Sequence, residues 1–463
     1  MLTMRTLNGR SLGLVIAAGS MITAISLGAR STFGLYLDPV VETLGTDRGT
    51  FSLVIAVQNL LWGLSQPLAG AVADRFGAAR VLGAGGVGYA VSLLIMSQAQ
   101  STGVLFLSAG VLIGIATGAA SFSVVLAAVG RMAPPQRVSM ALGIVTAMGS
   151  VGQFVLVPLV GELLDRYGWR ITVSLLSMVV VTVAGFTWPL RGRAIDQQQQ
   201  TGEASTRPAV PLRSDLRRAA HSRSYLMLNA AFFVCGFHVT FIGIHLVAYG
   251  GDVGVSEGNA RFALALIGLF NIIGSLVAGF LGSRFRKTYL LSIIYGLRAI
   301  SITAFVLLPA TTTTFIAFGA TIGLLWLSTV PLTGGIVASQ FGTTHSGTLF
   351  GIVFLSHQLG SFTGVWLGGE LADRPDGYTT VWWIAVGLGV LAAVLHLGID
   401  ESPAPQPPAA GDRRIVLSPA GGVAAVMLTV GGVAAVQPPR AMGADGTGEV
   451  LSHLCVLHPV DGN

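Results

Sequence analysis

Charged residues are scarce in this chain of 463 residues, where Asp, Glu, Lys and Arg together make up 10%. Soluble domains carry about 25% charged residues, and a soluble fold of this length needs more polar surface than so few can provide. Hydrophobic residues make up 52% of the chain, and the mean hydropathy is +0.74. The composition therefore excludes a soluble globular protein and predicts an all-α membrane protein that crosses the bilayer many times.

Cysteine is almost absent, because the chain holds only Cys235, inside an apolar run, and Cys455, near the C-terminus. Two such cysteines exclude a disulfide framework, a cysteine-rich zinc site and a paired redox motif. The P-loop pattern is also missing, so the chain carries no ATP site of that kind. The Gly-rich stretch 83–88 lies inside an apolar run and is predicted to be a helix-packing surface. We therefore expect no enzyme activity, no metal and no cofactor.

Long apolar runs follow one another along the chain, and twelve are long enough to span a bilayer, at about 20 residues each. They cover approximately 11–37, 50–73, 80–98, 103–129, 138–161, 170–190, 225–250, 260–281, 288–308, 311–336, 347–369 and 379–398. The first run is too long for a signal peptide and is predicted to be the first membrane helix. The pattern predicts a six-helix bundle at 1–190, a cytoplasmic linker at 191–224 and a second six-helix bundle at 225–400.

The C-terminal tail at 401–463 differs in composition from the rest, since it is rich in Pro, Ala and Gly. Its apolar run at 415–436 is broken by Pro419 and several glycines. Because Gly and Ala bury little apolar area against lipid, we predict a disordered or peripheral cytoplasmic tail. The alternative is a thirteenth span, which would move the C-terminus to the other side of the membrane.

Short charged motifs occur twice, each time at the end of an apolar run. GAVADRFG at 70–77 is matched by GFLGSRFR at 279–286, GELLDR at 161–166 by GELADR at 369–374, and GIV at 143–145 by GIV at 351–353. The three pairs have nearly the same separation, which argues against chance. They predict two structurally equivalent halves, an architecture that many secondary transporters share.

Basic residues are distributed unevenly between the two sides of the predicted membrane protein. With the N-terminus inside, sixteen lysines and arginines fall in the inner segments, and five fall in the outer loops: Arg48, Arg166, Arg170, Arg261 and Arg374. This excess predicts that both termini lie in the cytoplasm. The net charge of +6 has the same origin, because basic loops face anionic lipid, and no nucleic-acid partner is expected.

Taken together, these features resemble the major facilitator superfamily. The resemblance rests on six plus six helices, a basic central loop and a G-x-x-x-D-R-x-G motif between the second and third helices, and it covers residues 10–400. RSTFG at 30–34, SQP at 65–67 and FLSHQLGSF at 354–362 are most similar to bacterial members related to monocarboxylate and oxalate carriers. The resemblance implies two pseudo-symmetric bundles that give alternating access to a central cavity.

Two departures from related families concern the solute. Monocarboxylate carriers place an Asp and, four residues later, a substrate-binding Arg in the eighth helix, and here those places hold Asn271 and Ser275. The resemblance thus puts Asn271 at the solute site. Drug-proton antiporters usually carry an Arg in the fourth helix and a Gly-Pro signature in the fifth. Here 112–120 holds no Arg, and Pro158 follows Val157, which weakens an interpretation as a drug exporter.

Ionisable side chains inside the apolar runs are few, and every carboxylate falls in a loop, a helix end or the tail. Such groups are costly in a bilayer and usually face a cavity or a partner. Those away from the ends of the runs are Arg30, Arg298, His238, His245 and His357. A cavity with a cationic lining and no buried carboxylate suits an anionic solute. It does not suit sodium, which would need several oxygen ligands.

The two buried arginines are predicted to have different roles. The resemblance places the first helix beside the cavity, so Arg30 is the candidate solute ligand, with snorkelling or a pair with Asp38 as the alternatives. The ninth helix lies outside the cavity in that family. Arg298 is therefore predicted to bridge helices by bonding backbone carbonyls or Asn271.

The three histidines are candidate ligands for the solute and for protons. His238 and His245 are seven residues apart, hence on one helix face and about 10 Å apart along the axis. A histidine titrates near neutral pH, so either is a candidate proton carrier. His357, followed by Gln358 in the eleventh helix, is a candidate for the side of the cavity. For each histidine the alternative is a hydrogen bond between helices.

Asp74 and Arg75 of the repeated motif are predicted to control access to the cavity. A carboxylate at this helix end can cap a facing helix or pair with an arginine such as Arg137. In the family such contacts latch the outward-facing state, whereas the alternative is an ordinary charged turn. Weaker candidates for the cavity are the polar or aromatic residues Gln58, Gln66, Gln153, Trp326 and Thr329.

These observations predict a secondary transporter that moves a small organic anion, a carboxylate, together with protons. We expect it to act as a monomer in the bacterial cytoplasmic membrane. Two alternatives stay open. One is efflux of an amphipathic or cationic compound, and the other is a non-transporting receptor on the same scaffold, which would have no need of Asp74 and Arg75.

Overall fold

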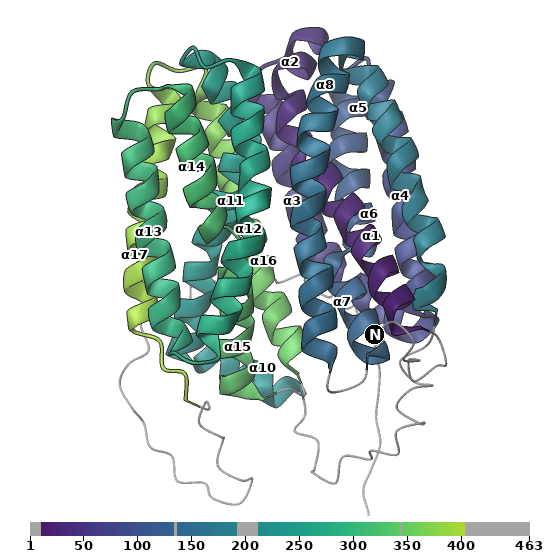
Figure 1. Cartoon of the computed structure of the whole chain (residues 1–463), viewed down its shortest axis with the longest axis vertical. Helices are drawn as coiled ribbons and strands as arrows, with labels where there is room; N and C mark the ends of the chain where they lie inside the picture. The colour runs from purple at the N-terminus through teal and green to yellow at the C-terminus, as the bar shows by residue number, and fades with distance from the viewer. Residues whose placement is uncertain (1–10, 134–136, 192–211, 343–344, 403–463) are drawn as a thin grey trace, which may run out of the picture. The chain divides into compact units, whose positions relative to one another are not determined.

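The computed structural model describes residues 11–133, 137–191, 212–342 and 345–402. In these ranges every regular element is a helix and no strand occurs (Figure 1). The prediction of an all-α protein is confirmed. Most of the predicted linker and the predicted tail from residue 403 onward lie outside the described residues.

The two halves contain a similar succession of helices. The N-terminal half consists of α1 (Leu12–Ser31), η1 (Phe33–Tyr36), α2 (Leu37–Leu44), α3 (Arg48–Phe76), α4 (Ala78–Ser97), α5 (Thr102–Leu105), η2 (Phe106–Leu112), α6 (Ile113–Ala119), α7 (Phe122–Met132), α8 (Val138–Phe186) and η4 (Trp188–Leu190). The C-terminal half consists of α10 (Leu212–His221), α11 (Arg223–Asp252), α12 (Glu257–Gly282), α13 (Lys287–Leu307), α14 (Thr312–Leu325), α15 (Thr329–Phe341), α16 (Ser346–Ala372) and α17 (Gly377–Leu397).

Ten helical stretches of the described chain are long and apolar enough to cross a membrane. One of them contains α8, which is two helices because Gly168, with φ 72° and ψ 168°, interrupts its helical backbone. A further crossing is α3, whose 29 residues are long enough although Pro67, Gln58 and Asn59 make it less apolar than the others. The described residues therefore contain twelve crossings, as the sequence predicts.

The fourth crossing is interrupted, although the sequence predicts one helix over 103–129. Its middle is the π-helical element η2, and α6 ends at Ala119. Ser121 then accepts a hydrogen bond from the Val124 N–H, which caps the start of α7. The cap explains why a new helix, α7, begins here, because the side chain of an N-cap residue accepts a hydrogen bond from a backbone N–H that the helix itself leaves without a partner.

The tenth crossing is also interrupted, between α14 and α15, where the sequence predicts a helix over 311–336. Arg298 of α13 donates to the Leu325 carbonyl from Nε (3.1 Å) and Nη2 (2.6 Å), and Nη2 also donates to the Trp326 carbonyl. Asn271 of α12 accepts from the Leu327 N–H at 2.9 Å. Backbone groups freed inside a membrane need such partners. Because these partners come from other helices, the local sequence pattern does not reveal the break.

Helices pack closely within each half and also across the two halves. In the N-terminal half α1 packs on α8 and α4 on α8, while in the C-terminal half α11 packs on α16, α12 on α14 and α13 on α17. Across the halves, α3 packs on α16 and α8 on α12, and η1 contacts α11 (Figure 1). These cross-bundle pairs enclose the cavity described below.

Glycines allow the backbones of α11 and α16 to touch. A Cβ added at Gly236 would lie 1.8 Å from the carbonyl oxygen of His357, and one added at Gly360 would lie 1.9 Å from that of Phe233. Real side-chain atoms never approach backbone oxygens so closely, so any larger residue must push the two helices apart. Membrane helices commonly pack this tightly where small residues lie at their contact.

We expect Gly236→Ala to destabilise the protein by about 1–3 kcal/mol, the usual cost of overpacking. Gly387→Ala is the matched control, because a Cβ at Gly387 in α17 meets nothing within 4 Å. A helical Gly→Ala change in open space stabilises by roughly 0.5–1 kcal/mol, so the control should melt at the same temperature or slightly higher. Melting of both purified variants in detergent measures the difference. Equal melting temperatures would contradict the close approach of the two helices.

Candidate functional site

A small cavity lies between the two bundles, with a volume of about 50 Å³. This space is on the scale of a few water molecules or one small solute. The lining residues are Arg30, Ser31, Phe33, Ile55, Gln58, Asn59 and Gln153 from the N-terminal half, and Val239, Thr240, Gly243, Ile244, Leu264 and Trp326 from the C-terminal half. Both bundles therefore contribute side chains to one space, as a site for a carried solute requires.

Arg30 is the one ionisable side chain among the cavity residues. Its Nη2 donates to Oδ1 of Asn59, whose Nδ2 is held by the Ile55 carbonyl at 2.8 Å. The guanidinium carbon of Arg30 lies 4.3 Å from the centroid of the Trp62 ring, which is a cation–π contact. The amide and the ring, both from α3, therefore fix the orientation of the Arg30 guanidinium.

Within the part of the chain that the structure describes, no carboxylate pairs with Arg30. None of the ion pairs within the described ranges includes this side chain. Asp38, the partner considered from the sequence, pairs with Arg48 at 2.9 Å. An arginine does not deprotonate in a protein, so Arg30 presents an unpaired positive charge beside the cavity.

At one end of the cavity, ion pairs join the two bundles. Arg48, at the start of α3, donates to Asp252 at the end of α11, with Nη1 2.6 Å and Nη2 3.0 Å from the two carboxylate oxygens. Asp47 caps α3 by accepting from the Thr50 N–H at 2.7 Å, and this hydrogen bond lowers the pKa of Asp47. The cap keeps the first turn of α3 in place, so that Arg48 faces the other bundle.

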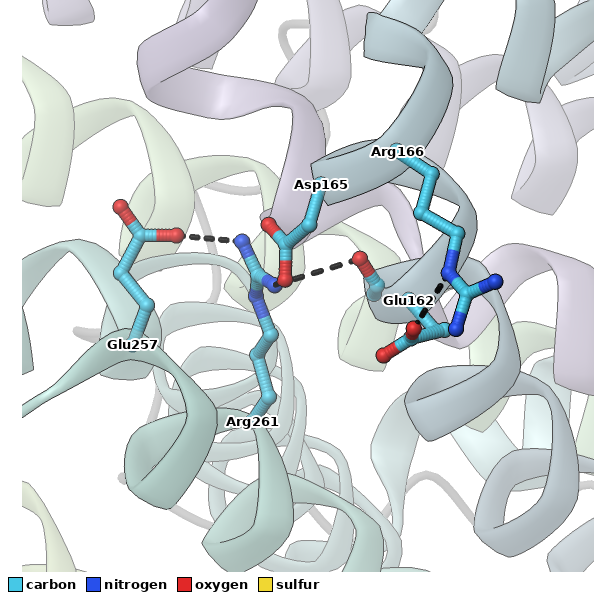
Figure 2. Close-up of polar contacts among 6 residues, drawn as sticks. Glu162, Asp165, Arg166, Glu257 and Arg261 are labelled. Atoms are coloured by element: carbon cyan, nitrogen blue, oxygen red, sulfur yellow. Dashed lines mark hydrogen bonds and ion pairs between the residues drawn. The ribbon is translucent and has the colours of Figure 1, made fainter.

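A second set of ion pairs joins the bundles at the same end. Arg261 of α12 donates from Nη1 to the Asp165 carboxylate (2.6 Å) and to the Gly161 carbonyl (3.2 Å), both on α8 (Figure 2). Its Nη2 donates to Glu257, one turn earlier in α12. Arg261 is buried, whereas the two carboxylates are more than half exposed. We call the end that holds Arg48 and Arg261 the paired end.

Towards the opposite end, the last contacts between the bundles lie just beyond the cavity. The Trp62 and Phe354 rings meet edge to face, with centroids 5.4 Å apart. The Asn271 amide donates to Ser150 Oγ at 2.7 Å on the other flank. The hydrogen bonds, ion pairs and ring contacts described above that join the two halves thus extend from the paired end as far as Trp62 and Asn271. The bundles are therefore held together mainly from the cavity to the paired end.

The three predicted histidines lie outside the cavity lining, each hydrogen-bonded within the C-terminal half. His238 Nε2 lies 2.8 Å from the Ala385 carbonyl. His245 lies 3.0 Å from the Val365 carbonyl through Nε2 and 3.0 Å from the Tyr378 hydroxyl through Nδ1. These contacts link α11 with α16 and α17. Their roles as ligands or proton carriers stay predictions.

Of the histidines, His357 is the one connected to Arg30 by hydrogen bonds. Its Nδ1 lies 3.0 Å from Gln358 Oε1, and Gln358 Nε2 donates to the main-chain carbonyl of Asn59 at 3.0 Å. Asn59 in turn accepts from Arg30. Because an amide oxygen only accepts, the His357 Nδ1 carries the hydrogen in this chain of contacts.

Asn271 and Arg298 both lie beside the break in the tenth crossing rather than among the cavity residues. Asn271 uses its amide nitrogen for Ser150 and its oxygen for Ser275 and Leu327. Arg298 is fully buried and bonds carbonyls of α14, in the manner expected of an interhelical bridge. The predicted solute contact of Asn271 stays a prediction, as does the bridging role of Arg298.

The motif residues Asp74 and Arg75 lie at the end of α3 that is farthest from the paired end. Asp74 Oδ1 pairs with Arg131 Nη1 of α7 at 3.3 Å, and not with Arg137, the arginine suggested by the sequence. The Arg75 guanidinium lies over the neighbouring Phe76 ring at 5.4 Å. Both contacts stay within the N-terminal half, so the gating role of this pair stays a prediction.

Two polar cavity residues, Asn59 and Thr240, are missing from the sequence analysis. Asn59 follows Gln58 in α3 and Thr240 lies within the apolar α11, and neither carries a charge that would single it out. Both lie on other helices than Arg30, so the sequence pattern around Arg30 does not point to them. They are identified as neighbours of Arg30 only by the cavity that all three line.

Comparison with known proteins decides the family. The model of the Major Facilitator Superfamily matches residues 19–250 and again residues 226–437. The chain belongs to the major facilitator superfamily. The first match covers most of the predicted N-terminal half and continues to residue 250, and the second covers the predicted C-terminal half and continues to residue 437. The members of this superfamily are transporters rather than enzymes. The chain is therefore a multi-pass membrane transporter of the major facilitator fold, and the prediction of no enzyme activity is confirmed.

Relatives within the major facilitator superfamily align along most of the chain. It is 26% identical over 385 residues to an uncharacterised MFS-type transporter of Bacillus subtilis, YcxA, covering 82% of this chain and 93% of that protein. It is also 26% identical over 396 residues to monocarboxylate transporter 13 of Rattus norvegicus, covering 83% of this chain and 89% of that protein. Monocarboxylate transporter 12 of Mus musculus is 22% identical, with 83% and 84% covered.

Among solved structures, a bacterial homologue of the human lysosomal transporter Spinster has the same fold. It was described in an inward-facing and occupied conformation, and it matches with a TM-score of 0.66 at 14% identity, covering 83% of this chain and 96% of that one. At this identity the likeness concerns the fold, and it confirms the predicted pair of helical bundles.

Proposed function

We propose that this transporter carries a small organic anion of the carboxylate class and that Arg30 binds it. The observation that carries the proposal is an arginine with no carboxylate partner in a cavity that both bundles line. Ionisable groups at such depth are costly unless a partner compensates them, and a guanidinium binds a carboxylate with two parallel hydrogen bonds. The relatives named monocarboxylate transporters support the same class of solute.

The transport cycle that we propose alternates between closure of the two ends. In the described conformation the paired end is closed by Arg48 and Arg261. The excess of basic residues in the inner segments assigns the paired end to the outside. The cavity then opens towards the cytoplasm when Trp62 parts from Phe354, and the region of Asp74 and Arg75 closes that side in the other half of the cycle. The inward-facing description of the structural relative supports this assignment.

We also propose where the transporter works. The distribution of basic residues supports cytoplasmic termini, and the Bacillus subtilis relative supports the cytoplasmic membrane of a bacterium. Because one chain supplies both bundles and the whole cavity lining, a single copy is sufficient for transport.

Protons are the coupling ions in this proposal, and His357 is their carrier. No carboxylate lies among the cavity residues, so a histidine is the remaining group that titrates near neutral pH. His357 is linked to Arg30 through Gln358 and Asn59. His357 therefore lies two hydrogen bonds from the main chain of Asn59, the residue whose side-chain amide orients the solute-binding guanidinium.

Uptake should rise as the external pH falls from about 8 to about 6, because a higher proton concentration outside drives uptake when protons are the coupling ions. In His357→Gln the pH dependence should be flat. His238→Gln and His245→Gln are tested beside it, and His221→Gln, at an exposed position of α10, is the control. Initial uptake rates at six pH values measure the effect. An unchanged slope in His357→Gln would move the proton carrier elsewhere.

Exchange in proteoliposomes tests the proposed function. Purified protein in vesicles loaded with unlabelled oxalate, pyruvate, succinate or benzoate should accumulate the same labelled anion from outside, and the exchange should saturate. An inward proton gradient should accelerate net uptake of the transported anion. If no anion exchanges while the same vesicles or intact cells export a cationic dye, the carboxylate assignment is wrong.

A further inference from the structure

Thr240 of α11 lines the cavity, yet its hydroxyl group has no hydrogen-bond partner. The residue is 4% exposed. Threonines in membrane helices commonly donate to the carbonyl four residues earlier, as Thr117 does to Ile113 (2.8 Å) and Thr146 does to Leu142 (2.8 Å). The Thr240 hydroxyl makes no such hydrogen bond. A buried polar group without a partner costs free energy, so its position calls for an explanation.

The cavity lining singles out Thr240 from other buried hydroxyl groups. Ser20, Thr23 and Ser26 of α1 also have side-chain oxygens without a partner, but none of the three lines the cavity. Among the residues that the structure describes, Thr240 alone combines an unpartnered buried polar atom with a place in the cavity wall. The remaining polar lining residues Ser31, Gln58, Asn59 and Gln153 each have a protein partner.

Thr240 and Arg30 belong to opposite bundles. Arg30 is on α1, whereas Thr240 is on α11, and the two helices reach the same space near the contact between η1 and α11. There the backbone of Gly34 lies directly against α11. A Cβ added at Gly34 would lie only 2.6 Å from the Gly243 carbonyl oxygen and 2.8 Å from the Ile244 carbonyl oxygen. A solute small enough for the cavity can therefore touch both bundles at once.

We propose that Thr240 is the solute ligand of the C-terminal bundle, donating a hydrogen bond from its hydroxyl to an oxygen of the carboxylate held by Arg30. The proposal rests on the proposed function and adds a second residue to its site. The carboxylate supplies the missing acceptor, since an ionised carboxylate offers four lone-pair sites and two suffice for a bidentate arginine. The bound anion thereby bridges the bundles, so that an occupied cavity favours their approach and an empty one does not.

Thr240→Val removes the hydroxyl and keeps the shape of the side chain. We expect the KM for radiolabelled oxalate or pyruvate, whichever the wild type exchanges, to rise about tenfold, the effect of losing a hydrogen bond to a charged group. Thr240→Ser should restore most of the affinity. Thr117→Val is the matched control, because the Thr117 hydroxyl bonds its own helix and lines no part of the cavity.

The melting temperature with and without the anion distinguishes a solute ligand from a residue that only supports the fold. Without solute, Thr240→Val should melt at the wild-type temperature or above, because it removes an unpartnered hydroxyl. When the anion is added at a concentration that saturates the wild type, it should raise the melting temperature of Thr240→Val by less than that of the wild type or of Thr117→Val. A wild-type KM and an undiminished shift in Thr240→Val would overturn the inference while leaving Arg30 in place. Absence of any anion exchange by the wild type would instead overturn the proposed function itself.

Discussion

Replacing Arg30 with Gln is expected to lower carboxylate uptake by about 100-fold or more, the factor that corresponds to losing a charge-assisted hydrogen-bond pair. Gln keeps a donor for Asn59 but has no charge for the solute. The protein should still fold, because no carboxylate is left behind without its partner. Arg30→Lys should recover part of the rate, since it keeps the charge but loses the planar stacking on Trp62.

The control for Arg30 is Arg166→Gln. Arg166 pairs with Glu162 within α8 and is 66% exposed, so its removal takes away a charge of the same sign at little cost (Figure 2). Initial rates of labelled anion uptake, normalised to the amount of folded protein in the vesicles, compare the three variants. Equal rates for wild type and Arg30→Gln would remove Arg30 from the solute site.

Replacing Arg48 with Gln is expected to shift the protein about tenfold towards states that are open at the paired end, since one charge-assisted contact contributes about 1.5–3 kcal/mol. Arg48 bonds Asp252 twice and Asp38 once. Its removal therefore breaks a link between bundles and also leaves two carboxylates facing each other. Transport should slow, because closing the paired end becomes unfavourable.

Distances between spin labels measure this shift. Labels at Glu42→Cys and Gly258→Cys, both exposed and on different bundles at the paired end, report its opening once Cys235 and Cys455 are replaced. Arg374→Gln is the matched control, because Arg374, two residues after the end of α16, pairs with Glu370 of the same half. Arg48→Gln should add a longer distance that the control lacks. The same distance distribution in both would show that the ion pairs do not hold the end closed.

The arrangement of crossings could be read from the sequence because it follows from local composition. Each span is a run of apolar residues of bilayer length, and the repeated motifs at 70–77 and 279–286 mark equivalent turns in the two halves. The low charge content made ionisable residues in the spans stand out, so Arg30 could be named before the cavity was known.

The interruptions and the fine structure of the site could not be predicted, because they depend on contacts between distant helices. The break at Trp326 exists where Arg298 and Asn271 satisfy its backbone groups, and those residues are far away in sequence. Asp74 meets Arg131 rather than Arg137 for the same reason. Thr240 looks like any other hydroxyl in an apolar run until its missing partner and its place in the cavity are seen together.

A structure determined with a transported carboxylate bound tests the central claim most directly. We predict density for the anion between α1 and α11, with its carboxylate oxygens against the Arg30 guanidinium. Solute density elsewhere in the protein, with the Arg30 guanidinium unchanged against Asn59 and Trp62, would contradict the assignment of Arg30 as the residue that binds the carried anion.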